Sequence, residues 1–369
     1  MLLRDQKGQA LLFTAFMASL ILVLVTGSLA VAGSHRRNVV RQEQQVQVYY
    51  IAEAGLERAV ARIKAEPGWL DGIPPGVSVR LDDLEGPYAG GEIAEVTLQK
   101  VPWGMGFRVD LTSVGKLVSA RKTLRASLYS VSARSFLGGL SLLPESPLDL
   151  DIKGNFLLEG SGNQTGRLLL NGNLYLSGNA AINGDVYVSG EVTGRDKVTG
   201  QVNSGFRELP GFPAMDLTYY EEEARRQGRY YDGNLSWSGT IQLDGVYYVA
   251  GNAYLSGTYS GQGIIVVRGN VYFTGNLSGS LGSALAVIAL GDVDVKNHTV
   301  KAAIITEGTL YLQGNAVVEG AILAKGTNLG AITGNITIRY SEEGIPLGLL
   351  GGLLTELEVL SWKEAYPIF

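Results

Sequence analysis

The 369-residue chain contains no cysteine and only two histidines, His35 and His298. The absence of cysteine excludes disulfides, thiolate catalysis and cysteine-based metal sites, so we expect burial alone to stabilise the fold. With two histidines, most histidine-dependent catalysis is disfavoured, and we expect no metal and no cofactor. The formal net charge is −5, which implies no general electrostatic attraction to nucleic acid.

Long runs that are both apolar and uncharged are also absent, with one exception, the segment 10–33. At a rise of ~1.5 Å per residue its ~24 residues span ~36 Å, enough to cross a hydrocarbon core of ~30 Å. The helical spacing of apolar residues then continues until Pro67-Gly68, through Val39, Val40, Val46, Tyr49, Tyr50, Leu56, Ala59, Val60 and Ile63. The pattern predicts one long helix over 9–66, with a transmembrane part, 10–33, and an amphipathic part, 34–66.

Two sequence features of this helix carry a resemblance to a known family. A short basic leader, 1–8, ends in Lys7-Gly8, and the helix closes on YYIAEAGLERA at 49–59. This region resembles the N-terminal region of PilX-like type IV minor pilins. The resemblance implies that a prepilin peptidase cuts between Gly8 and Gln9 and that the new N-terminus is methylated. Phe13 stands where major pilins usually carry a glutamate, which PilX-like members often lack.

The same resemblance implies a location and a set of partners. The helix would hold the protein in the bacterial inner membrane, single-pass, with its head outside the cytoplasm, and would later pack against other pilins at the cell surface. Two other interpretations remain open: a secretory signal peptide cleaved after Ala30-Val31-Ala32, and a plain signal anchor. Neither needs the amphipathic continuation beyond the membrane.

The segment 67–135 is predicted to form a small antiparallel sheet. Three runs alternate between apolar and polar residues, Glu95–Val101, Gly106–Val114 and Ser119–Ser132. We expect them to form a meander that packs on the amphipathic half of the helix, as a pilin-type head.

Glycine recurs at every sixth residue in three stretches, Gly154–Gly190, Gly233–Gly275 and Gly308–Gly326. Between the glycines, apolar and polar residues alternate without resetting, which is typical of short strands wound around one apolar interior. About nine coils of about 18 residues, stacked at ~4.8 Å, would give a rod of ~43 Å. The predicted fold class is therefore an α+β pilin-like N-terminal part followed by an all-β parallel β-solenoid over 149–340.

Two segments interrupt or follow this array. The insert 206–232 is predicted to carry a short helix between Asp216 and Gly228 that packs on the solenoid flank. The apolar tail, 341–369, is expected to cap one end of the rod, and the pilin head to cover the other.

Five tyrosines recur in the pattern Gly-x-h-Tyr-h, where h is apolar, and are predicted to face outward: Tyr175, Tyr187, Tyr254, Tyr272 and Tyr311. Tyr254 and Tyr272 are 18 residues apart, so we expect them to stack on neighbouring coils. Such rings could bind a polysaccharide, a surface ligand or a nucleic-acid base, or could simply shield an exposed strand face. Nucleic acid is the less favoured ligand because the array lacks a basic stripe.

A catalytic site is weighed at Asp292, Asp294 and His298. The two carboxylates, at i and i+2, would lie roughly 6–7 Å apart, a separation suited to acid/base work on a glycosidic bond. The same residues are also typical of a solvated solenoid face.

The favoured prediction is a non-enzymatic minor pilin or pseudopilin at the tip of a type IV pilus, acting in assembly and in surface or ligand contact. The alternatives are an envelope-anchored scaffold that polymerises end to end, resembling bactofilins, a DNA-uptake pilin, and a polysaccharide-acting β-helix enzyme.

Overall fold

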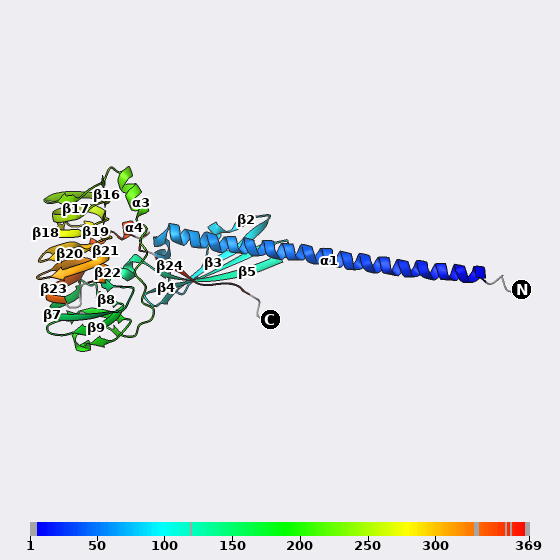
Figure 1. Cartoon of the computed structure of the whole chain (residues 1–369), viewed down its shortest axis with the longest axis horizontal. Helices are drawn as coiled ribbons and strands as arrows, with labels where there is room; N and C mark the ends of the chain where they lie inside the picture. Colours follow the sequence, from blue (N-terminus) through cyan, green and yellow to red (C-terminus); the bar gives the residue numbers. More distant parts are fainter. Residues whose placement is uncertain (1–5, 119, 328–331, 351–352, 355, 366–369) are drawn as a thin grey trace.

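The computed structural model describes residues 6–118, 120–327, 332–350, 353–354 and 356–365. Its longest element is the single helix α1 (Gln6–Ala65), 60 residues long, which projects far from the rest of the molecule (Figure 1). The helix runs unbroken through both predicted halves and is followed by a 3₁₀ turn, η1 (Pro67–Gly72), where proline halts it. The predicted long helix is confirmed.

The second half of α1 packs on an antiparallel sheet built from β3 (Gly91–Trp103), β4 (Gly106–Leu117) and β5 (Ala120–Val131). This is the predicted meander. Two short strands, β1 (Ser78–Arg80) and β2 (Gly86–Tyr88), pair with β3, and the 3₁₀ turn η2 (Asp82–Leu84) lies between them. The core between helix and sheet contains Val48, Ile51, Leu56, Ala59 and Ile63 from α1 and Ile93, Val96, Leu98, Val109, Leu111, Leu124 and Leu128 from the sheet.

The described part of the C-terminal tail does not cap the solenoid, which corrects the expectation for 341–369. After η4 (Glu342–Gly344) and α4 (Leu347–Leu350), the strand β24 (Glu356–Glu364) pairs antiparallel with β5 at the edge of the sheet. Leu357 and Trp362 of β24 pack against the core beneath α1. The tail is apolar because it completes the small antiparallel sheet and packs against its core.

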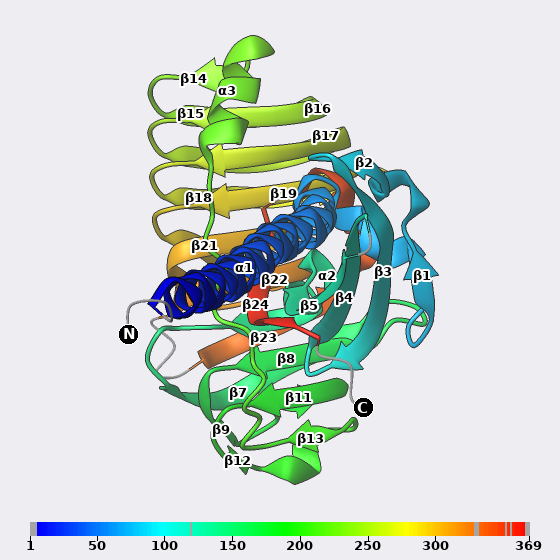
Figure 2. The same ribbon diagram turned by 90° about the vertical axis from the view of Figure 1, so that its right-hand side faces the viewer.

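The rest of the chain is a parallel β-solenoid of about nine turns, as predicted (Figures 1 and 2). Its first half contains β6 (Gly139–Leu142), β7 (Leu148–Gly160), β8 (Gly166–Leu170), β9 (Gly172–Leu176), β10 (Ala181–Ile182), β11 (Gly184–Val188), β12 (Val192–Thr193), the 3₁₀ turn η3 (Arg195–Lys197) and β13 (Val202–Asn203). Its second half contains β14 (Tyr230–Tyr231), β15 (Leu235–Trp237), β16 (Thr240–Val249), β17 (Ala253–Val267), β18 (Val271–Gly279), β19 (Ala284–Ala289), β20 (Val293–Lys296), β21 (Thr299–Gln313), β22 (Val317–Thr327) and β23 (Ile332–Tyr340).

Glycine sets how closely successive turns approach. Gly184 pairs with Gly166 of the preceding turn, and a Cβ on Gly184 would meet the carbonyl oxygen of Gly166. Gly172 has a φ of +147° and lies against the backbone of Leu148 in the same way. At these corners a side chain has no room, which explains the regular spacing of glycine.

The turns are not stacked in the order of the sequence. The chain begins the solenoid near its middle at β6, winds to one end at β13, crosses to the opposite end, and winds back from β14 to β23 (Figure 2). There β22 pairs with β6, and β23 pairs with β7 over nine residues from Ile332↔Ile152 to Tyr340↔Gly160. We call this junction of the two halves the seam.

The crossing segment, 204–229, carries the predicted helix as α3 (Thr218–Arg226). Asp216 accepts a hydrogen bond from the Thr218 backbone N–H at 3.0 Å; the Thr218 side chain, and then this backbone contact, lower the pKa of the Asp216 carboxyl. The segment therefore spans the solenoid from end to end, whereas the sequence predicted only a local insert.

One side of the solenoid is buried on its outer surface as well as on its inner one. We call it the covered face; its outward residues on successive turns are Tyr248, Val266, Ile288, Ile305, Leu323, Ser141 and Leu169. They pack against α2 (Ala133–Phe136), α3 and the residues that follow α4, including Leu353 and Leu354. The part formed by α1 and the small sheet thus joins the side of the solenoid rather than its end, which corrects the expectation, and the solenoid lies across the stalk (Figure 1).

Candidate functional site

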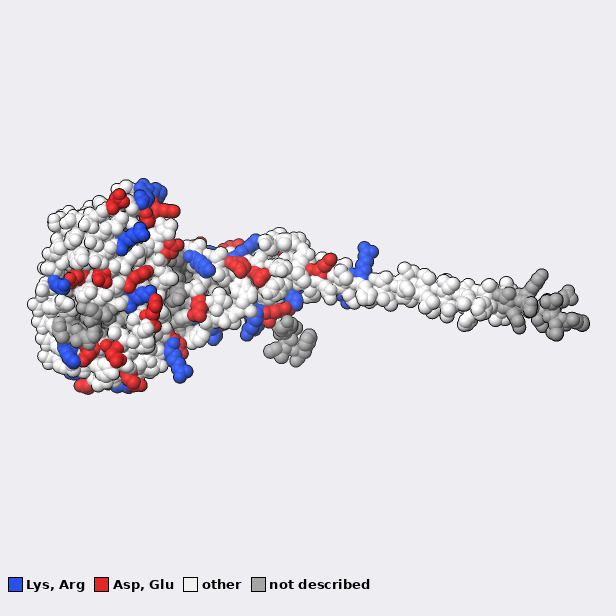
Figure 3. Space-filling view, in the orientation of Figure 1, with Lys and Arg blue, Asp and Glu red and all other residues white. Residues whose placement is uncertain are grey.

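The first half of α1 exposes an apolar surface on all sides. Every described side chain from Leu11 to Val40 is exposed, including Leu12 at 75% and Leu22 at 67%. No charged side chain is seen along this stretch, beyond the basic residues at its base, in the space-filling view (Figure 3). By length and composition this helix can cross a membrane.

The hydroxyl groups within the apolar segment 10–33 donate to backbone carbonyls of the preceding helical turn. Thr14 donates to the Leu11 carbonyl at 2.9 Å, Thr26 to Leu22 at 2.8 Å and Ser28 to Leu24 at 2.8 Å. A segment surrounded by lipid or by other apolar helices must pair its polar groups internally. The predicted processing residues Gly8 and Gln9 lie in the first turns of α1. Their predicted role stays a prediction.

Tyrosine and aspartate share one outward column of the solenoid, which we call the tyrosine column. Tyr254 pairs in register with Tyr272, Tyr272 with Asp294, and Asp294 with Tyr311. The rings of Tyr254 and Tyr272 are stacked, with centroids 5.3 Å apart and an interplanar angle of 16°, which confirms the predicted stack. Because these two rings cover each other's faces, a sugar or base would find a free face only at the ends of the pair.

The other two candidate tyrosines lie elsewhere. Tyr175 occupies the corresponding face of the first half, between Asp151 and Thr193, and is 40% exposed. Tyr187 is instead on the side that includes the covered face, where it contacts Phe206 of the crossing segment at 5.2 Å between ring centroids. It follows Tyr175 by 12 residues, which is less than a full turn, so the repeated motif falls on a different face. Binding by these five tyrosines stays a prediction.

Asp292 belongs to a ladder of side chains at one corner of the solenoid. Each member accepts a hydrogen bond at 2.8 Å from a backbone N–H of the next turn: Asn234 from Asn252, Asn252 from Asn270, Asn270 from Asp292, and Asp292 from Thr309. We call this the corner ladder. Asp292 thus acts here as a substitute for asparagine, following Gly291 as the asparagines follow Gly233, Gly251 and Gly269.

The other two candidate catalytic residues, Asp294 and His298, also have contacts within the solenoid, Asp294 through its side chain and His298 through its backbone. Asp294 forms an ion pair with Lys296 at 2.7 Å, and this contact raises the pKa of the Lys296 ammonium. The second oxygen of Asp294 is buried without a hydrogen-bond partner. The backbone carbonyl of His298 accepts a hydrogen bond from Val317 at 3.0 Å. Among the described residues, no group of three or more His, Asp or Glu side chains could hold a metal ion.

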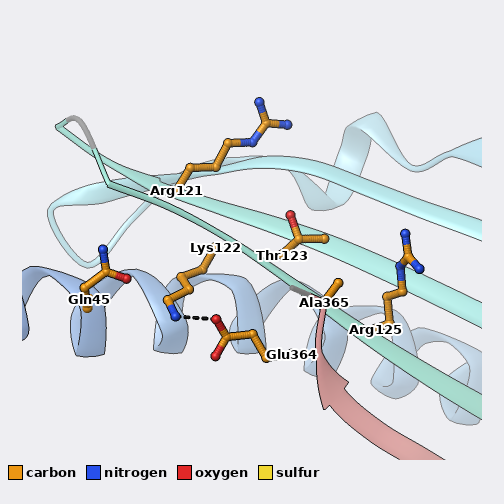
Figure 4. Close-up of a pocket in the computed structure, with 7 residues that line it drawn as sticks. All are labelled: Gln45, Arg121, Lys122, Thr123, Arg125, Glu364 and Ala365. Atoms are coloured by element: carbon orange, nitrogen blue, oxygen red, sulfur yellow. Dashed lines mark hydrogen bonds and ion pairs between the residues drawn. The ribbon is translucent and has the colours of Figure 1, made fainter. Parts of the chain in front are cut away.

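A hollow of about 500 Å³ lies where the sheet meets α1, and no sequence pattern indicates it (Figure 4). It is lined by Gln45, Arg121, Lys122, Thr123, Arg125, Glu364 and Ala365. Lys122 forms an ion pair with Glu364, while Arg121 and Arg125 project from the opposite side of β5. Sequence reasoning missed the hollow because Glu364 arrives from β24, which the sequence placed at the solenoid.

Comparisons with known proteins find likeness at the level of structure and none at the level of sequence. The sequence matches no protein-family model and no curated protein. Among solved structures, the chain is similar to the competence-associated pilin ComZ from Thermus thermophilus, with 16% sequence identity and a TM-score of 0.38. The similarity covers 87% of this chain and 97% of that chain.

Proposed function

We propose that this protein is a membrane-anchored, PilX-like minor pilin that enters a type IV pilus or pseudopilus through α1. The observation that carries the proposal is the different surroundings of the two halves of α1. Its first half exposes apolar side chains on all sides, and its second half packs on an antiparallel sheet and shares a core with it. The first half therefore needs an apolar environment that the chain does not supply, either lipid or the helices of other pilins.

Processing and partners follow from this assignment. A prepilin peptidase removes residues 1–8, the inner membrane holds the mature subunit with its head outside the cytoplasm, and other pilins then pack around α1. The sequence 49–59 and the leader ending at Gly8 support this proposal.

The N-terminal residue of the mature protein tests this assignment. We expect mass spectrometry of membrane and sheared-pilus fractions to find a methylated Gln9 as the first residue. The variant Gly8→Asp should keep its leader and stay out of the pilus fraction, whereas Gly27→Ala, which changes an exposed helix glycine, should be processed normally. A first residue at Gly33 would identify a secreted protein and contradict the proposal.

We further propose a position at the pilus tip and a non-enzymatic role in assembly and surface contact. Support comes from the solenoid, which lies across the stalk and is much wider than α1 (Figure 1). Subunits of this shape would be difficult to stack side by side along a shaft. Immunogold labelling should find the protein at pilus ends, and labels at regular intervals along shafts would argue for a shaft subunit.

A further inference from the structure

Three arginines follow the apolar half of α1 directly. Arg36, Arg37 and Arg41 lie three, four and eight residues beyond Gly33, and all three side chains are exposed. The space-filling view shows basic side chains at the base of the apolar stretch (Figure 3). We call these three residues the arginine collar. No acidic residue lies between Gly33 and Glu43, so the collar is a patch of one charge sign.

The collar has no counter-charge of its own. None of its guanidinium groups forms an ion pair within the part of the chain that the structure describes. Glu43 is only two residues beyond Arg41, a spacing at which two side chains on a helix do not face each other. Further along, Gln45 lines the hollow of Figure 4, where Lys122 and Glu364 are paired with each other. The positive charge of the collar is therefore free to act on a partner outside the chain.

The positions of the collar match the headgroup layer of a bilayer. If the hydrocarbon core ends at Gly33, the helical rise places Arg36 and Arg37 about 4.5–6 Å beyond it, and Arg41 about 12 Å beyond it. The headgroup layer occupies roughly the first 5–8 Å. Two of the arginines therefore lie inside this layer. Arg41 reaches it because its long side chain can extend back toward the membrane.

Arginine is well suited to bind phosphate. Its planar guanidinium forms paired hydrogen bonds to phosphate oxygens and stays charged at physiological pH. Arg37 and Arg41 are four residues apart and lie on one face of α1, where both can contact the same phosphate group. Arg37 donates from Nε to the Gly33 carbonyl at 3.3 Å, which leaves its terminal nitrogens for that contact.

We propose that the arginine collar binds the headgroups of anionic phospholipids in the leaflet on the side of the head. The proposal rests on the proposed function, because it requires α1 to span the bilayer with the head outside the cytoplasm. It goes further, because the collar then fixes the depth of α1 in the membrane, and its lipid contacts must break when the subunit enters a filament. Cleavage after Gly8 would leave the collar as the basic group next to the apolar segment, since Arg4 and Lys7 are removed with the leader.

The absence of cysteine makes a direct test possible. The full chain carries one fluorophore, at Asn38→Cys inside the collar, and is placed in nanodiscs of phosphatidylcholine with a minor fraction of phosphatidylglycerol. Brominated acyl chains, which quench the fluorophore, are carried either by the phosphatidylglycerol or by an equal amount of the phosphatidylcholine. We expect brominated phosphatidylglycerol to quench at least about fivefold more strongly, and high salt to reduce the difference. Equal quenching by the two lipids would overturn the proposal.

A second reporter separates this proposal from the proposed function. A fluorophore at Ile21→Cys, in the middle of the apolar segment, should be quenched equally by both brominated lipids. If it is not quenched, α1 does not span the bilayer and the proposed function fails. If it is quenched while the label at Asn38 shows no lipid preference, the collar proposal alone fails. Leu281→Cys, 99% exposed on the solenoid, should be quenched by neither lipid.

Charge variants identify the groups responsible. Replacing the collar arginines by glutamine should lower the preference for phosphatidylglycerol by up to about fivefold for each charge removed. Arg125→Gln, at an exposed arginine of the sheet, is the matched control and should leave the preference unchanged. A preference that survives all three collar substitutions would overturn the proposal. Soluble glycerol phosphate at constant ionic strength should not compete, and competition would assign the collar to free anions instead of lipid.

Discussion

Single side chains connect the turns of the solenoid at its corners. In the corner ladder, each Asn or Asp oxygen replaces a missing backbone acceptor for the turn that follows. Loss of one acceptor leaves a backbone N–H without its partner, and such losses carry an energetic penalty.

Asn252→Ala tests the ladder. The substitution removes the acceptor of the Asn270 N–H, so we expect the free energy of unfolding to fall by about 1–2 kcal/mol in urea titration. Asn163→Ala, at an exposed turn, is the matched control and should change stability little. Equal effects of the two variants would show that the ladder contributes nothing.

A buried tyrosine predicts the behaviour at alkaline pH. Tyr220 is 4% exposed, donates to the Leu349 carbonyl at 2.9 Å, and burial raises the pKa of its hydroxyl from 10.0 to about 12. Because the unfolded chain ionises first, the stability that the neutral hydroxyl contributes is complete below pH 10 and is lost between pH 10 and about 12. Tyr220→Phe should flatten the pH dependence of chemical unfolding in this range. An unchanged profile would assign the alkaline loss to other groups.

For single residues, the sequence predicted which side chains stack but not which ones form structural hydrogen bonds. The 18-residue spacing placed Tyr254 and Tyr272 correctly, because spacing alone determines which residues stack. It could not distinguish a ladder aspartate from a catalytic one, since Asp292 has the same parity and spacing in either role. Only the hydrogen bond to Thr309 tells them apart.

The helix α1 and the small sheet pack closely where their small residues face each other. At Gly115 of β4, a Cβ would lie 2.5 Å from the Val48 carbonyl and 2.7 Å from the Ala52 nitrogen of α1. The sheet therefore touches the helix backbone at this point. The sequence 49–59 supplies the matching small residues, such as Ala52 and Gly55.

Gly115→Ala tests this contact. We expect a loss of about 1–3 kcal/mol in the free energy of unfolding, because neither backbone can move away without disturbing the core. Gly72→Ala, where nothing lies within 4 Å of the added methyl group, is the control. If both variants are equally stable, the helix and sheet are not held at this distance.

The long helix and the meander were predictable because each rests on a local period. The strand β24 was not, because its partner β5 lies more than two hundred residues earlier in the chain. The apolar tail gave no indication of which exposed edge it would cover. Short strands at the solenoid ends, two residues each in β13 and β14, also escaped prediction; they offer little edge for another chain to pair with.

At the scale of the whole molecule, the seam holds the two halves of the solenoid together. It joins strands about 180 residues apart, with the buried Ile338 beside Leu158 and an ion pair between Arg339 and Glu159 at 2.8 Å. Glycine spacing predicted the turns but not their order, because every turn presents a similar edge to its neighbour.

The seam predicts that the halves stay associated after the chain is cut. A specific protease site inserted between the exposed Arg207 and Glu208 should yield two fragments that migrate together on a native gel and separate only in denaturant. The same site inserted at Leu281, within the second half, is the comparison and should also leave the parts associated. Fragments that separate after the cut at Arg207 would show that the seam, even with the pairing of β24 and β5, does not hold the halves together.

The position of β24 has one more consequence. Val131 at the end of β5 pairs with Glu356 at the start of β24, so residues 132–355 form, in effect, the loop of a single β-hairpin. The small sheet and its helix therefore make a complete folding unit, and the solenoid is a domain inserted at one hairpin turn of that unit. A short linker in place of the inserted solenoid should leave a folded protein made of the helix and the small sheet. Other domains with neighbouring termini could be inserted at the same position.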